Sequence, residues 1–159
     1  MIQINRQVEP GKYKLSDIFP DIRQNPILLE IFTTSTEIDD VLSNTLVIVS
    51  DKPRYMKVDN EDGSILIGRR HLELSDVAIL YLDIIHELVH VKQHRQGIDL
   101  YDRSKAYVDR QTEIDAYEFA IGEARRIGFT AKQILDYLCV EWITPEEHQR
   151  LAKRLKIVG

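Results

Sequence analysis

The chain of 159 residues contains a single cysteine, Cys139, so no disulfide can form within it. Small secreted domains usually depend on disulfides, and a lone thiol therefore indicates a reducing compartment, with Cys139 acting as a small apolar residue in a helix. No apolar stretch is long enough to span a bilayer, and residues 1–6 lack the apolar core of a secretory signal. We expect a cytoplasmic protein that makes no membrane contact.

An excess of basic charge is also missing. The chain has 21 basic and 26 acidic residues, which gives a formal net charge of −5 and no general attraction to a polyanion. The basic pairs Arg69-Arg70 and Arg125-Arg126 are typical of solvated helix faces. A nucleic-acid partner is therefore not expected.

Neither an internal repeat nor a low-complexity segment divides the chain, and 43% hydrophobic residues suffice for one core. We predict a single domain over residues 1–159. Within it, residues 1–44 form an N-terminal covering segment, residues 45–128 form the catalytic core, and residues 129–159 form C-terminal helices.

Strands are predicted before the long helices. The β-branched run 45–50 and the alternating run 54–59 are bounded by turn residues, and a third strand is expected over 64–67. These three runs predict a small antiparallel meander. Two short helical patches, at 15–19 and 26–32, precede it. The fold class is α+β.

The most informative pattern is the run HELVH at 86–90, which lies inside a largely apolar helix predicted between Ser75-Asp76 and Gly97. Two histidines four residues apart on a helix converge on one metal, and the glutamate between them reaches the water on that metal. The pattern predicts His86 and His90 as zinc ligands and Glu87 as a general base. The alternative is a pair of buried histidines satisfied by backbone carbonyls.

A third ligand is expected on a second helix, predicted over 111–124. Glu113 lies in its first turn, and the small residues Ala116 and Ala120 would let the two helices approach closely. Two histidines, one glutamate and a water make an open, catalytic zinc site, whereas a structural site has four protein ligands. We therefore predict Glu113 as the third ligand of Zn²⁺.

Two further helices are expected after Gly128. Thr130 begins one that runs through Leu138, and the capping box at 144–147 begins another that runs to about Lys156.

His94 continues the spacing of His86 and His90 along the same helix face. It lies about 12 Å from His86 along the axis, too far for both to bind one tetrahedral metal. The metzincin pattern also fails, because Gln93 and Gln96 occupy the positions that would need glycine and histidine. We interpret His94 as a residue at the rim of the site.

HELVH, followed after 23 residues by E-x-D-A-x-x-F-A, resembles the gluzincin clan of HExxH zinc metallopeptidases over about residues 75–125. The pattern is most similar to the minigluzincins and to the ImmA/IrrE-type peptidase family. The resemblance implies a zincin-like fold, in which a small sheet precedes the active-site helix and its edge strand pairs with an extended peptide. It implies His86, His90 and Glu113 as ligands and Glu87 as the base.

The chain departs from the family pattern at Tyr117, where relatives often carry Asp or Asn. A ligand histidine usually donates its other nitrogen to a carboxylate or carbonyl, and Asp115 and Asp83 are the two candidates for that partner. The donor that would stabilise an oxyanion stays open. Its tyrosine candidates, each more typical of a packing residue, are Tyr101, Tyr107, Tyr117 and Tyr137.

Taken together, the residues predict a zinc-dependent metalloendopeptidase acting on a peptide or protein substrate. A self-inhibited form or a homo-oligomer would keep such an enzyme restrained. The alternative is an inactive or latent zincin-fold module that binds peptides without cleaving them. The ImmA/IrrE resemblance adds a third possibility, a toxin, an antitoxin or a factor that cleaves a repressor.

Overall fold

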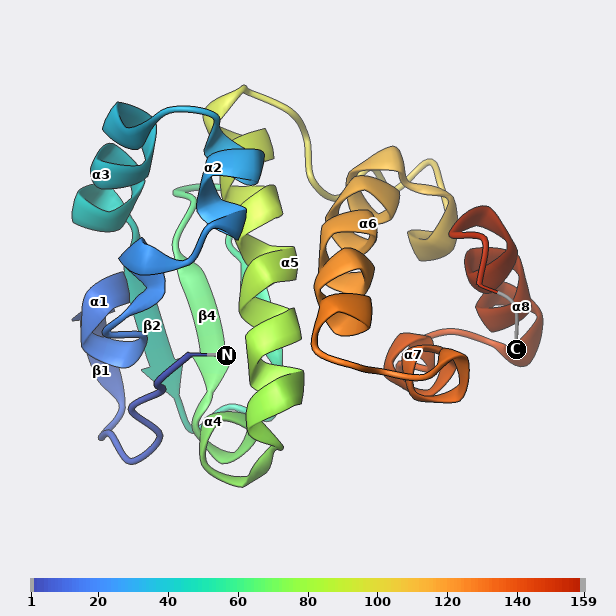
Figure 1. The fold of residues 1–159 in the computed structure, drawn as a ribbon, viewed down its shortest axis with the longest axis horizontal. Coiled ribbons are helices and arrows are strands. Elements are labelled where there is room, and N and C mark those ends of the chain that lie inside the picture. Colours follow the sequence, from blue (N-terminus) through green and yellow to red (C-terminus); the bar gives the residue numbers. More distant parts are fainter. Residues whose placement is uncertain (1, 158–159) are drawn as a thin grey trace.

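The computed structural model describes residues 2–157 and has an α+β fold (Figure 1). The single domain predicted over residues 1–159 thus extends beyond the described part at both ends. The strands are β1 (Gly11–Lys14), β2 (Leu46–Ser50), β3 (Met56–Val58) and β4 (Ile65–Gly68). The helices are α1 (Leu15–Ile18), α2 (Ile27–Phe32), α3 (Ser35–Asn44), α4 (Arg69–Leu74), α5 (Val77–Arg95), α6 (Gln111–Arg126), α7 (Ala131–Leu138) and α8 (Pro145–Arg154), with short 3₁₀ turns η1 (Ile22–Gln24) and η2 (Tyr107–Asp109).

The sheet has the strand order β1-β2-β4-β3 and is mixed. β1 and β2 are antiparallel, β3 and β4 are antiparallel, but β2 and β4 run parallel. The predicted antiparallel meander is therefore wrong. The register places Val47 beside Ile65 and Val49 beside Ile67, so the buried side chains of the two central strands lie next to each other. This pairing sends β3 to the edge of the sheet.

One strand and two α-helices were not predicted. β1 is mostly exposed and lacks an apolar alternation, so nothing in its sequence predicts a strand. α3 has only two buried residues, Ile38 and Val41, although Thr34 caps its first turn. α4 is only six residues long and ends directly before α5.

Helix α5 lies between the sheet and α6 (Figure 1). It packs against β3 and α2 on one side and against α6 on the other, which explains why apolar residues occur around most of its circumference. Its ends lie within one residue of the prediction. The N-cap is Asp76 and not Ser75, which ends α4, and Gly97 has the left-handed backbone (φ 77°) that ends helices.

The close packing of α6 on α5 is also as expected, because Ala116, Ala120 and Ala124 are fully buried. Capping boxes at Thr130 and Thr144 begin α7 and α8, which lie beyond α6 from the sheet (Figure 1). Cys139 follows the last residue of α7 and is exposed, so its predicted place inside a helix is wrong. Across residues 2–157, no helix combines the length and the apolar character needed to cross a membrane.

Candidate metal centre

The three predicted ligands meet between α5 and α6. His86 and His90 lie one turn apart on α5, and Glu113 lies in the first turn of α6. The two Nε2 atoms are 3.1 Å apart, and the Glu113 Oε1 atom is 3.0 Å from Nε2 of His86 and 2.9 Å from Nε2 of His90. All three side chains are buried. The geometry thus forms a group that can hold a metal ion.

The spacing of these atoms fits a divalent metal. Nitrogen and oxygen ligands at about 2.0–2.2 Å around a tetrahedral ion lie about 3.3–3.5 Å from one another. The three distances of 2.9–3.1 Å fall short of that by only a few tenths of an ångström. Two imidazoles and a carboxylate are also a donor set that leaves a fourth position for water. The residues therefore fit the ion that the sequence predicts.

Gln93 holds the His90 ring in the orientation that a ligand needs. The Gln93 amide nitrogen donates to the Thr112 carbonyl at 3.0 Å, which fixes its oxygen toward Nδ1 of His90, 2.7 Å away. Because an amide oxygen only accepts, Nδ1 must carry the proton. A neutral His90 then has its lone pair on Nε2, facing His86 and Glu113. Gln93 also joins α5 to the residue next to Glu113.

The predicted partners of the ligand histidines are wrong. Asp115 accepts a hydrogen bond from Gln111, and Asp83 accepts hydrogen bonds from His71 and Tyr137. His86 Nδ1 is buried and has no hydrogen-bond partner among residues 2–157. Gln93, which sequence reasoning used only to exclude the metzincin pattern, lies three residues after His90. That spacing on a helix was the signal that could have identified it.

Tyr117 contacts His86 through its ring, with the two ring centroids 4.4 Å apart. Its hydroxyl instead forms a hydrogen bond with the hydroxyl of Tyr107 at 2.7 Å. Tyr117 therefore presents an aromatic ring, and no polar group, to His86.

The buried charges of the cluster depend on one another. Burial lowers the pKa of His90, but the Glu113 carboxylate outweighs burial and raises it to about 9. Burial raises the pKa of Glu113, but protonated His90 and the hydrogen bonds from both histidines lower it to about 2. Burial lowers the pKa of His86, so that ring is neutral. In the absence of metal, one proton on His90 balances the Glu113 carboxylate.

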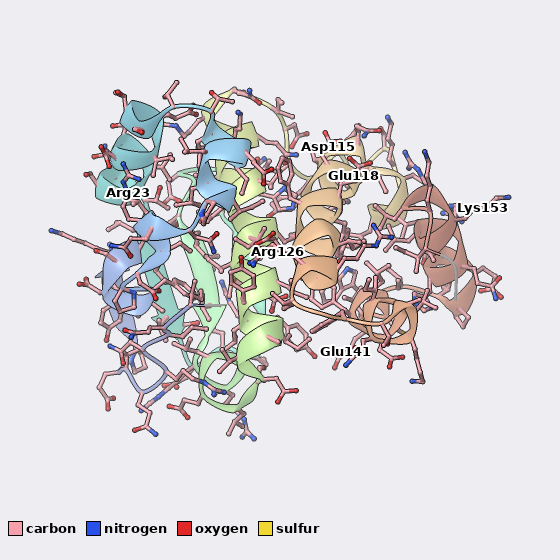
Figure 2. All side chains as sticks on the ribbon, in the orientation of Figure 1. Arg23, Asp115, Glu118, Arg126, Glu141 and Lys153 are labelled. Atoms are coloured by element: carbon pink, nitrogen blue, oxygen red, sulfur yellow. The ribbon has the colours of Figure 1, made fainter. Side chains whose placement is uncertain are left out.

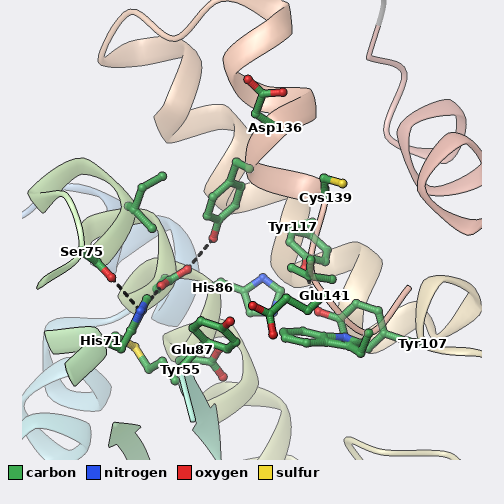
Figure 3. A pocket seen from close by; sticks show the side chains of 16 residues that line it. Tyr55, His71, Ser75, His86, Glu87, Tyr107, Tyr117, Asp136, Cys139 and Glu141 are labelled. Carbon is green, nitrogen blue, oxygen red and sulfur yellow. Dashed lines mark hydrogen bonds and ion pairs between the residues drawn. The ribbon is translucent and has the colours of Figure 1, made fainter. Parts of the chain in front are cut away.

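Glu87 lies outside this cluster and lines a cavity of about 380 Å³ together with His86 (Figure 3). Only 6% of Glu87 is exposed, and burial raises the pKa of its carboxyl well above the ordinary value. The Val58 backbone, at the edge of the sheet, hydrogen-bonds to this carboxylate and partly offsets the effect. Glu87 is thus a weakly solvated carboxyl beside the ligand cluster.

The walls of the cavity come from elements far apart in the chain. α4 contributes His71, whose ring nitrogens bond to Ser75 at 2.8 Å and to Asp83 at 2.7 Å (Figure 3). Tyr107, Tyr117 and Tyr137 line it too, whereas Tyr101 does not. The hydroxyl of Tyr101 donates to the Val58 carbonyl at 2.5 Å. The cavity is also lined by residues that no local sequence pattern predicted. Besides His71, these are Tyr55, Glu141 and Trp142.

His94 does not belong to the cluster, as predicted. It is half-buried, and the backbone of Gly63 lies against its ring. Several of the basic residues are paired with carboxylates: Arg69 with Glu73, and Arg126 with Glu123. Figure 2 shows Arg126 and Lys153 on well-separated helices, so these two charges do not form one patch.

A scan against protein-family models found no match to this chain, and searches of curated proteins and of solved structures found none either.

Proposed function

We propose that the protein is a zinc-dependent metallopeptidase with a zincin-like fold, related to the gluzincins by its HELVH motif. The observation that carries this proposal is a buried His86, His90 and Glu113 group whose neighbour Glu87 faces the same cavity as His86. A site that served only to stabilise the fold would have no use for a buried carboxyl at this position.

The residues divide the chemistry between them. His86, His90 and Glu113 would hold the zinc, which when bound supplies a water of lowered pKa and polarises the substrate carbonyl. Glu87 takes the proton from the attacking water and passes it to the leaving amine. Burial raises the pKa of its carboxyl, which makes Glu87 a stronger base than an exposed carboxylate. Gln93 keeps the His90 lone pair on Nε2.

The edge of the sheet supports the binding of a short extended peptide. The Tyr55 carbonyl accepts from Gly68 of β4, and the Asp59 N–H donates to Ser64, the residue before β4. The alternation of an antiparallel pair therefore turns the backbone groups of Met56 and Val58 toward the free edge. The Val58 carbonyl already accepts from Tyr101. Met56 also lines the cavity, and its backbone groups can pair with the backbone of a substrate.

Peptide digestion tests the proposal. The zinc-loaded chain is incubated with a mixture of unstructured peptides, and new termini are counted by mass spectrometry. Glu87→Gln should lose cleavage by at least a thousandfold and keep its zinc. Glu118→Gln, which removes an exposed charge on the same helix as Glu113, should behave as the parent does.

Two outcomes would contradict the proposal. Cleavage by Glu87→Gln at the parental rate would mean that Glu87 is not the base. A parent that binds zinc and peptides but produces no new termini would be the peptide-binding module that is the alternative.

A further inference from the structure

The cavity beside Glu87 has an unusual chemical lining. Aromatic rings and carboxylates dominate it, and within residues 2–157 neither lysine nor arginine lines it. The rings are Tyr55, Tyr107, Tyr117, Tyr137 and Trp142, and the carboxylates are Asp83, Glu87, Asp136 and Glu141. Such a lining favours a positively charged ligand group, because both ring faces and carboxylates attract cations.

Three of the rings are arranged as a partial cage. Trp142 lies with its ring centroid 6.0 Å from that of Tyr55 and 5.5 Å from that of Tyr107, the latter pair being edge to face. Trp142 and Tyr55 remain 52% and 42% exposed, so their rings are accessible from solvent. The cage therefore stands at the open side of the cavity, where a long side chain can enter.

The carboxylates differ in how far they are already engaged. Asp83 accepts from His71 and Tyr137, and Asp136 is paired with Lys132 at 2.9 Å. Glu141 forms no ion pair with any side chain of residues 2–157. Its carboxylate lies near the Tyr55 hydroxyl and raises the pKa of Tyr55. Glu141 thus places an uncompensated negative charge directly beside the aromatic cage.

We propose that this cavity binds the arginine or lysine side chain of a peptide substrate next to the bond that is cut. The cationic group lies against the faces of the aromatic rings Tyr55, Tyr107 and Trp142, and Glu141 pairs with it. The cleavage part rests on the proposed function, whereas the preference for a cation concerns binding and can be measured without cleavage.

Trp142 makes that measurement direct, because it is the only tryptophan in the chain. Its fluorescence is followed in zinc-loaded Glu87→Gln protein, which holds peptides without cutting them. The probes are acetyl-Ala-X-Ala-amide peptides with X as arginine, lysine, norleucine or glutamate. Arginine and lysine peptides should bind at least tenfold more tightly than the norleucine peptide, and the glutamate peptide should not bind.

Charge variants locate the cation. Adding Glu141→Gln to Glu87→Gln should weaken the binding of the arginine peptide about three- to tenfold and leave the binding of the norleucine peptide unchanged. Adding Glu118→Gln, which removes an exposed charge outside the cavity, should not change the affinity for either peptide. Unchanged thermal unfolding of the variants would show that the fold is intact.

Other results would overturn the inference. Equal binding of the norleucine and arginine peptides would remove the charge preference, even if the parent is a peptidase. Tighter binding of Ala-norleucine-Ala-amide, which has a free amino terminus, than of the acetylated arginine peptide would assign the cavity to an α-amino group instead. If the parent cuts no peptide but the arginine preference is found, the proposed function and the cleavage part of this inference fail, and the cation preference of the cavity stands.

Discussion

Replacing Gln93 should weaken metal binding although Gln93 touches no metal. Its side chain is 6% exposed and bridges His90 Nδ1 and the Thr112 carbonyl. Gln93→Leu removes both bonds while keeping most of the volume. Loss of the partner of a ligand histidine typically costs about 10- to 100-fold in metal affinity, or about 1.4–2.8 kcal/mol. The buried Nδ1–H of His90, left without its acceptor, should also lower the free energy of unfolding of the metal-free protein by about 1–3 kcal/mol.

Two further variants separate these effects. Gln93→Glu keeps an acceptor for His90 but cannot donate to the Thr112 carbonyl, so it should bind zinc within about fivefold of the parent and still be less stable. Gln149→Leu, an exposed position on α8, controls for the change of side chain. Zinc affinity is measured by competition with a chromophoric chelator, and stability by urea unfolding with chelator present. Zinc binding by Gln93→Leu within twofold of the parent would refute the role given to Gln93.

The remaining predictions concern pH and backbone packing. Because metal must displace the proton on His90, whose pKa is raised to about 9, zinc affinity should fall about tenfold per pH unit below 9, as chelator competition would show; a flat profile would contradict it. For the metal-free protein, the His90 contribution to stability is fully present below its ordinary pKa of 6.5 and should be lost as pH rises through 9; the Glu113 contribution, present above 4.5, should be lost as pH falls toward 2. Thermal unfolding of chelated protein across this range tests both. Gly68→Ala should destabilise the β3–β4 hairpin by at least about 2 kcal/mol, because the added Cβ would lie 1.9 Å from the Arg54 carbonyl oxygen. Gly122→Ala in α6 meets no neighbour, so it should stabilise the protein by about 0.5–1 kcal/mol. Equal unfolding midpoints for the two variants would contradict this packing.

The ligand cluster could be predicted because its geometry is mostly local. His86 and His90 are brought together by one helical turn, and Glu113 needs only that its helix pack against α5. The small residues that are buried in α6 already indicated this packing in the sequence. The capping boxes of α7 and α8 were predictable for the same reason, since each involves residues within one turn.

The rest depends on contacts between distant residues. Parallel pairing of β2 with β4 is set by the three-dimensional core, because the same alternation of buried residues suits either strand direction. β1 is an exposed strand whose own sequence does not indicate a strand. It is a strand because it pairs with β2. The cavity joins Tyr55 and His71 to Glu141 and Trp142, which no local spacing connects. The division into covering segment, core and C-terminal helices stays a prediction.

Metal content tests the central claim most directly. The chain is purified without a histidine tag and reconstituted with zinc, and bound metal per chain is determined by elemental analysis beside Glu113→Ala and the exposed control Glu118→Ala. We expect about one zinc in the parent and in Glu118→Ala, and far less in Glu113→Ala. No zinc in the reconstituted parent would mean that HELVH is part of a buried helix that holds no metal and that the proposed function is wrong. Equal zinc in all three proteins would mean that Glu113 is not a ligand and would contradict the site proposed here.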